Sequence, residues 1–219
     1  YTFIALDFWD QIGTFEVERF RQIDMANKYE AIINSYSIDE SDVYKSFLVR
    51  PPLLNFLTRS SEHLLPLLFQ SLSVIDDSFV NCTDPYSSLN EISNSAIPII
   101  QKFFILDPQT TFGCLTSFFE QTASLTNWQA RYAQLLSVIC ICDECDSYPF
   151  VLQFLTSIAP MMLTTLDSHK ESPLIVEVTL SAFLAAFQTY HIYLNLENGI
   201  NPLIALITLH CQSQSTEAI

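Results

Sequence analysis

The clearest pattern of apolar and polar positions in the chain runs from Leu125 to Cys142. Its large apolar residues recur at offsets of 0, 4, 7, 8 and 11, which is the spacing of one face of an α-helix. Thr126 and Gln129 fit a capping box at its start, in which each side chain bonds to the other residue's free backbone N–H. We therefore predict a helix here, packed between helices at Thr111–Leu125 and Phe150–Leu166. The residues of its apolar face are Trp128, Tyr132, Leu135, Leu136 and Ile139.

A second regularity is the spacing of helix-weakening residues, each followed by a dense apolar run. Pro66, Gly113, Pro160 and Pro202 follow one another at steps of 47, 47 and 42 residues. A HEAT-type repeat has two helices and a period of about 40–47 residues. Since no alternation typical of β-strands persists, we predict an all-α fold, a HEAT-repeat α-solenoid of antiparallel helix pairs stacked in sequence order. The predicted second helices of the pairs are Ser87–Leu106, Thr126–Cys142 and Ser172–Tyr190.

The N-terminal region predicts further helices. Tyr1–Phe20 has Ile4, Phe8, Ile12 and Phe15 at helical spacing as its apolar face. Because the first residue is not Met and lies within a predicted helix, we expect the chain to be a segment of a longer solenoid. Its approximate units are 1–50, 51–106, 107–145, 146–190 and 191–219. Two more helical segments are predicted in this region, at Met25–Tyr36 and Asp42–Arg50.

Charge restricts the partners of such a fold. The 219-residue chain has 24 acidic and nine basic residues, a net charge of −15. This argues against nucleic acid as a direct ligand, because phosphate binding needs clustered Lys and Arg, and it favours basic protein segments. Asp76, Asp77 and Asp84, in a linker predicted at Asp76–Pro85, are the candidate partner-binding residues, with ordinary solvated linker charge as the alternative interpretation. No apolar run approaches the ~20 residues of a membrane span, so no membrane insertion is expected.

The sequence offers few groups for catalysis or metal binding. Cys140, Cys142 and Cys145 are closely spaced, but a zinc site usually needs four ligands. The fourth would be His210 or Cys211, which a stacked solenoid keeps apart from the other three. The four histidines are isolated, and three glycines are too few for a phosphate-binding loop. We therefore expect structural free thiols, no metal, no cofactor and no enzymatic activity.

The stretch around Trp128 also carries a resemblance to a known family. Asn127, Trp128, Arg131 and Ala133 match the motif Asn-Trp-Arg-x-Arg-x-Ala, with Gln129 in place of the first arginine. This resembles the second helix of a HEAT repeat in the importin-β (karyopherin-β) superfamily of nuclear transport receptors. The Phe-Trp pair of the predicted first helix is similar to that superfamily as well. We expect Trp128 to be largely buried in the core and Arg131 to tie neighbouring repeats together.

The resemblance implies a receptor that binds protein partners in nucleocytoplasmic transport through shape and charge. The implied partners are Ran-GTP, basic cargo or adaptor segments, and FG nucleoporins. It also implies an acidic loop within one repeat, to which Asp76, Asp77 and Asp84 correspond. The implied location is the cytoplasm, the nucleus and the nuclear envelope. The repeat pattern alone fits equally well the alternative of a HEAT scaffold subunit in a phosphatase or chromosome-associated complex.

Overall fold

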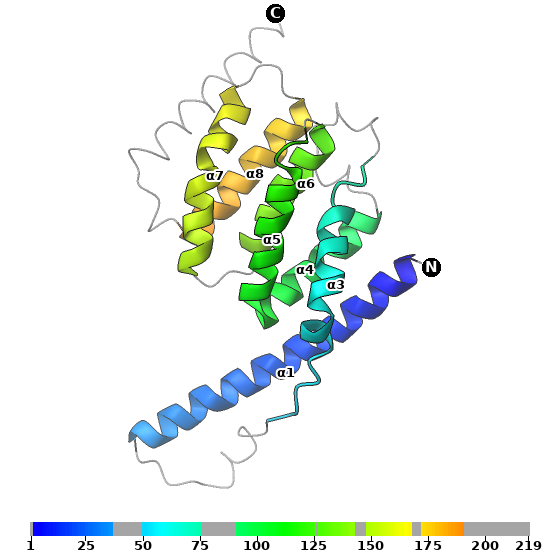
Figure 1. Cartoon of the computed structure of the whole chain (residues 1–219). Coiled ribbons are helices and arrows are strands. Elements are labelled where there is room, and N and C mark those ends of the chain that lie inside the picture. Colours follow the sequence, from blue (N-terminus) through cyan, green and yellow to red (C-terminus); the bar gives the residue numbers. More distant parts are fainter. Residues whose placement is uncertain are drawn as a thin grey trace, which may run out of the picture.

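The computed structural model describes residues 2–36, 50–75, 91–125, 127–142, 148–167 and 172–190. These parts of the chain form seven α-helices and no β-strand, so the predicted all-α class is confirmed for them (Figure 1). Residues 37–49, 76–90 and 191–219 lie outside the described ranges, and with them the helix predicted to begin at Asp42 and the landmark Pro202. The helices are α1 (Thr2–Tyr36), α3 (Phe56–Ser71), α4 (Glu91–Leu106), α5 (Pro108–Thr122), α6 (Trp128–Cys142), α7 (Pro149–Asp167) and α8 (Pro173–Tyr190).

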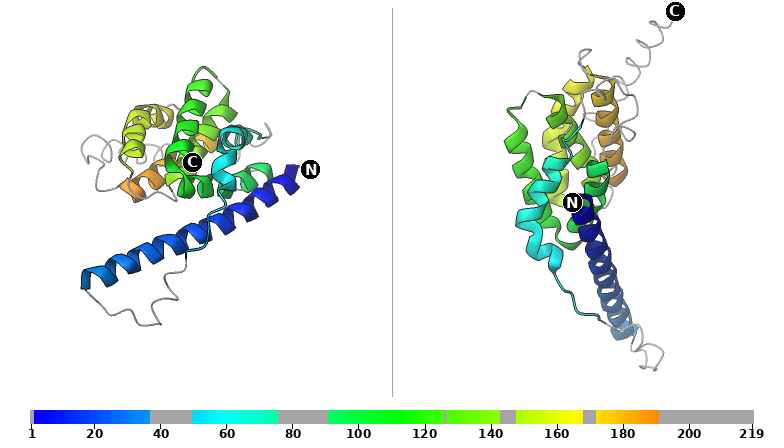
Figure 2. Two further views of the ribbon diagram at one scale, coloured as in Figure 1. Left: turned by 60° about the horizontal axis from the view of Figure 1, so that its bottom comes forward. Right: turned by 90° about the vertical axis from the view of Figure 1, so that its right-hand side faces the viewer.

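The helices lie in two layers. In one layer α6 lies between α4 and α8, and α1 packs along α4 at the edge. In the other layer α3 lies beside α5, and α5 lies beside α7. Phe112 of α5 is 4.9 Å from Phe150 and 5.5 Å from Phe154 of α7, measured between ring centroids. The layers are joined by contacts of α3 with α4, α5 with α6, and α7 with α8 (Figure 2).

Helix α6 is enclosed on all sides. Every residue from Tyr132 to Cys142 is buried, including the polar Gln134 and Ser137. The single apolar face predicted from the sequence is therefore too narrow, because α4, α5 and α8 surround the helix. Both polar side chains are hydrogen-bonded. Gln134 Nε2 donates to Thr122 Oγ1 of α5 at 2.8 Å, and Ser137 Oγ donates to the carbonyl oxygen of Gln134 at 2.6 Å.

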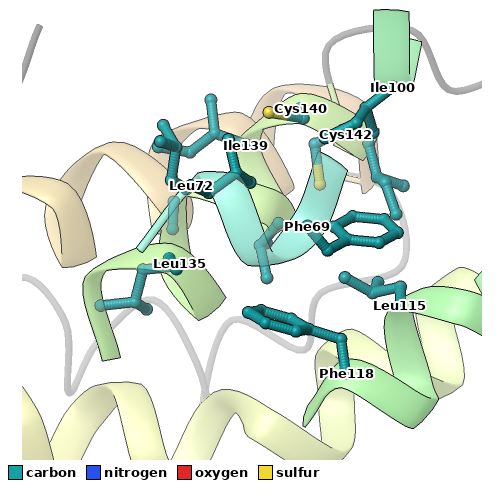
Figure 3. Packing of buried hydrophobic residues seen from close by; sticks show 14 of the residues in the cluster. Phe69, Leu72, Ile100, Leu115, Phe118, Leu135, Ile139, Cys140 and Cys142 are labelled. Carbon is teal, nitrogen blue, oxygen red and sulfur yellow. The ribbon is translucent and has the colours of Figure 1, made fainter. Parts of the chain in front are cut away.

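The core joins the two layers through a cluster of large apolar side chains. Phe69 of α3 is fully buried and stacks on Phe118 of α5, with ring centroids 5.7 Å apart. Figure 3 shows both rings in one cluster with Leu115 of α5 and Cys142 of α6. The position of α3 on the rest of the protein therefore depends on this cluster.

The start of α6 differs by one residue from the predicted capping box. The side-chain oxygen of Asn127 accepts a hydrogen bond from the backbone N–H of Ala130 at 3.3 Å, which is N-cap geometry. Thr126, the predicted cap, lies outside the described residues. The predicted C-terminal ends of α4, α6 and α8 are confirmed, at Leu106, Cys142 and Tyr190.

Helix α1 is longer than predicted and packs through a different face. It runs unbroken to Tyr36, where the sequence pattern predicts two segments. The predicted apolar face is only partly correct: Ile12 packs half-buried against the core, but the buried residues of the helix include Leu6, Gly13 and Val17, which were not predicted. Three residues of the predicted face are exposed to solvent, namely Ile4 (73 %), Phe8 (56 %) and Phe15 (44 %).

Gly13 lies where Lys102 of α4 and Leu57 of α3 approach α1 closely. A Cβ at position 13 would lie 2.8 Å from Lys102 Cδ and 3.3 Å from Leu57 Cδ2, so a side chain there would displace the lysine. Lys102 Nζ contacts Asp10, at 2.5 Å from its carboxylate and 3.1 Å from its carbonyl oxygen. The glycine and the ion pair together determine where α1 and α4 cross.

The N-terminus of α3 is capped from α1. Asn55, the residue before α3, has a left-handed φ of 57° and its side chain makes no capping hydrogen bond. Glu16 is only 2 % exposed, and its carboxylate accepts hydrogen bonds from the backbone N–H of Phe56 at 2.6 Å and of Leu57 at 3.1 Å. One buried side chain of α1 thus satisfies two N–H groups that the start of a helix leaves without partners.

Candidate functional site

A hollow of about 820 Å³ opens between the C-terminal ends of α3 and α5 and the start of α6. Its lining includes Gln70 of α3 and Phe118 and Gln121 of α5. A second hollow of about 360 Å³ lies between α3 and α5, nearer their N-termini, and is lined by the same three residues. The two hollows are therefore adjacent, and we call them together the α3–α5 groove.

Two helix-weakening residues shape this groove. Pro66 lies inside α3, where it removes one backbone N–H and bends the helix. Gly113 of α5 has no heavy atom within 4 Å of the place where a Cβ would be, so its missing side chain leaves open space. Gln70 follows Pro66 by four residues and Gln121 follows Gly113 by eight, which places each glutamine on the same helix face as its landmark. Neither glutamine is among the residues predicted from the sequence, although this spacing is a signal for both.

The charged groups that act on the α3–α5 groove lie outside its lining. Burial raises the pKa of the Cys114 thiol in the smaller hollow, and the negative charges of Glu62 and Asp107 raise it further. At the other end the C-termini of α3 and α5, with partial negative charge, meet the N-terminus of α6, with partial positive charge. None of the residues that line the two hollows is a lysine or an arginine. None of them is an aspartate or a glutamate either, so the lining carries no formal charge.

A separate hollow of about 500 Å³ lies between α5 and α7. Phe119 and Phe154 line it, and so does Arg131 of α6. Arg131 Nη1 donates a hydrogen bond to Oγ1 of the buried Thr165 at 3.1 Å, which joins α6 to α7. This contact agrees with the structural role predicted for Arg131, which is to tie one pair of helices to the next.

The predicted partner-binding residues Asp76, Asp77 and Asp84 lie outside the described residues. Ile75 directly precedes Asp76, is buried and lines the larger hollow. The chain thus continues from the wall of the α3–α5 groove into the acidic segment.

Trp128, which the sequence predicts to be largely buried, is only partly buried against the core. It lies in the first turn of α6 rather than at the centre of the helix.

The described cysteines do not form a cluster suited to a metal. Cys140 and Cys142 are buried in α6, whereas Cys145, His210 and Cys211 lie outside the described residues. Within the described ranges, no three His, Cys, Asp or Glu side chains are placed to hold a metal ion. The same part of the chain has no helix whose length and apolarity would suffice to cross a membrane.

Comparison of the chain with protein-family models, with curated proteins and with solved structures finds no match in any of the three. A function for this chain is therefore inferred from its own residues and geometry. The features that bear on it are the layered helix pairs, the residues around Trp128 and the α3–α5 groove.

Proposed function

We propose that this chain is a segment of a HEAT-repeat α-solenoid of the importin-β kind, which binds protein partners during nucleocytoplasmic transport. The observation that carries the proposal is the order of the helices: α4, α6 and α8 follow one another in one layer and α3, α5 and α7 in the other. In a solenoid each helix pair contacts only its neighbours. The ends of α3 and α5 and the start of α6 line one hollow, so α3 runs parallel to α5 and α6 runs antiparallel to them.

The residues that resemble the superfamily give a second observation in support of the proposal. Asn127 caps α6, Trp128 packs against the core in its first turn, and Arg131 bonds to Thr165 of the following helix. All three make contacts inside the stack. The residues of the motif thus hold the helix pairs together, and we expect partners to bind at the surface of the stack.

On this proposal the partners are Ran-GTP, basic cargo or adaptor segments, and FG nucleoporins. The chain would move between cytoplasm and nucleus through the nuclear envelope. The net charge of −15 supports the basic partners, because it attracts cations over long distances. Asp76, Asp77 and Asp84 would steer such segments, raising the association rate more than the final affinity, since exposed ion pairs contribute only ~0–1 kcal/mol each.

The immobilised chain is expected to retain Ran loaded with GTP in preference to Ran loaded with GDP. It should also retain a basic signal peptide in preference to the same peptide with glutamine in place of lysine and arginine. Immunoblotting of Ran and fluorescence of the labelled peptides give the retained amounts. Equal retention within both pairs would contradict the proposal and favour a HEAT scaffold of another complex, such as a phosphatase or chromosome-associated one.

Replacement of Asp76, Asp77 and Asp84 together by asparagine tests the steering role. The association rate of the basic peptide should fall as salt rises beyond ~0.15 M, where the screening length is about 8 Å. We expect a slower association and a flatter salt dependence in the variant, measured by stopped-flow fluorescence. Its circular dichroism and melting temperature should be unchanged, because linker charges contribute little stability. If variant and wild type have the same association rate and the same salt dependence, these three residues take no part in binding the basic peptide.

A further inference from the structure

Helix α1 presents to solvent a stripe of side chains that recur at alternating steps of four and three residues, from Ile4 to Ile32. We call it the heptad stripe, and every one of its side chains is exposed. A period of 3.5 residues is the spacing at which two helices pack in a coiled coil. The polar members in the middle of the stripe are Gln11, Glu18 and Gln22. The apolar members are Ile4, Phe8, Phe15, Met25, Tyr29 and Ile32.

The contacts of α1 with the other described helices leave this stripe uncovered. Helices α3 and α4 contact α1 on the side of Leu6, Gly13 and Val17, which are buried and lie on the opposite half of the helix. Figure 2 shows α1 along one edge of the described helices, with its C-terminal half extending beyond them. An exposed apolar surface of this length marks an interaction site.

The heptad stripe is complementary to itself when two copies of α1 run antiparallel. In such a pair each layer joins one position of the first copy to a different position of the second. One register sets Ile4 against Tyr29 of the second copy and Phe8 against Met25 of the second copy. Apolar side chains then meet at both ends of the pair, each layer occurring twice by the two-fold symmetry.

The polar positions match in the same register. Gln11 faces Gln22 of the second copy, and two amides can donate and accept hydrogen bonds between them. Glu18 faces Phe15 of the second copy. Within one chain, Arg19 Cζ lies 4.0 Å from the centroid of the Phe15 ring, so the carboxylate approaches a ring that carries a guanidinium. Polar pairs of this kind fix the register of a coiled coil at some cost in stability.

The charges beside the stripe favour the antiparallel direction. In the register above, Asp7 lies next to Lys28 of the second copy, and 72 % of the Lys28 side chain is exposed. A parallel pair would instead set Glu18 against Glu18, and it would bring no basic residue opposite Asp7. Like charges would then meet in the parallel pair, whereas opposite charges meet in the antiparallel one.

We propose that α1 forms an antiparallel coiled coil with α1 of a second copy of this chain, through the heptad stripe. The proposal does not rest on the proposed function, because it uses only the spacing, exposure and charges of one helix. A further helix pair of a longer solenoid would compete for the same face. The second copy is favoured because the stripe pairs with itself in both its apolar and its polar positions.

Sedimentation equilibrium of the 219-residue chain over a range of concentrations tests the proposal. We expect the wild type to reach the mass of a dimer. Phe8→Asp should weaken the dimer by ~30-fold or more, as for loss of an aromatic anchor at an interface. Leu184→Asp is its matched control, since Leu184 of α8 is 57 % exposed and Phe8 is 56 % exposed. Gln11→Leu combined with Gln22→Leu should tighten the dimer by about tenfold, because it replaces a polar layer by an apolar one.

An exchange of charges tests the direction of the two helices. Asp7→Lys and Lys28→Asp should each weaken the dimer by about threefold to tenfold, because each sets like charges side by side. The two changes in one chain should restore wild-type affinity. Added salt should tighten the wild-type dimer, because two chains of net charge −15 repel each other, whereas it should weaken the binding of a basic peptide. Circular dichroism should be the same for all variants, since the changed residues are exposed.

A wild-type chain that stays monomeric at every concentration would overturn the proposal and leave the stripe to a helix pair of a longer solenoid. Equal dimer affinities of Phe8→Asp and Leu184→Asp would show that the heptad stripe is not the interface. A dimer that the combined charge exchange does not restore would contradict the antiparallel pairing. None of these outcomes changes the expected preference for Ran-GTP, so this proposal and the proposed function can fail separately.

Discussion

Replacement of Phe69 by alanine is expected to lower the free energy of unfolding by about 3–5 kcal/mol, the range for removal of a large buried ring. Phe69 has no exposed surface and stacks on Phe118 in the cluster that joins α3 to α5 and α6. The cavity cannot close easily, because the start of α3 is held on α1 by Glu16. Urea unfolding followed by circular dichroism measures the change.

Leu67→Ala is the matched control for Phe69→Ala. Leu67 belongs to the same helix, but 61 % of its surface is exposed, so its truncation should change stability by no more than about 0.5 kcal/mol. Similar unfolding midpoints of the two variants would show that α3 is not packed on the core as described.

The second large effect is expected for Glu16→Ala, at about 2–3 kcal/mol, because hydrogen bonds to a charged group contribute more than neutral ones. The change leaves the backbone N–H groups of Phe56 and Leu57 without their acceptor. Water can replace the carboxylate only in part, since this side chain is almost fully buried. We therefore expect a lower unfolding midpoint and faster amide hydrogen exchange at Leu57.

Two further variants sharpen this test. Glu18→Ala removes an exposed carboxylate from the same helix and should be nearly neutral. Glu16→Gln keeps one acceptor oxygen and should fall between the wild type and Glu16→Ala. If Glu16→Ala were no more destabilising than Glu18→Ala, capping of α3 from α1 would contribute nothing to stability.

The helices could be predicted from the sequence because their signals are local. Apolar spacing identifies α4, α6 and α8, and the acidic residues that follow mark the last residues of α4 and α6. The buried face of α1 could not be predicted in this way, because this helix has apolar residues on more than one side. Gly13 and Lys102 lie on the side that is buried, and they meet only when α4 packs on α1. The cap of α3 by Glu16 depends in the same way on a contact between distant segments.

Less of the candidate site than of the fold could be predicted from the sequence. The acidic residues that composition favours, Asp76, Asp77 and Asp84, lie outside the described residues. Gln70 and Gln121 are exposed polar residues of amphipathic helices, a pattern that surface positions show without any function. Only the packing of α3 beside α5 places the two amides on opposite sides of one groove.

The contacts of α1 also determine when this helix can dock during translation. Asp10 and Lys102 are 92 residues apart in the sequence. A ribosome adds about 5–20 residues per second, so α1 is synthesised roughly 5–20 s before its partner lysine. Until then Leu6 and Val17, which α4 later covers, cannot be buried in this way. A nascent chain is therefore most exposed to association with other nascent chains, and most in need of a chaperone, before Lys102 emerges from the ribosome.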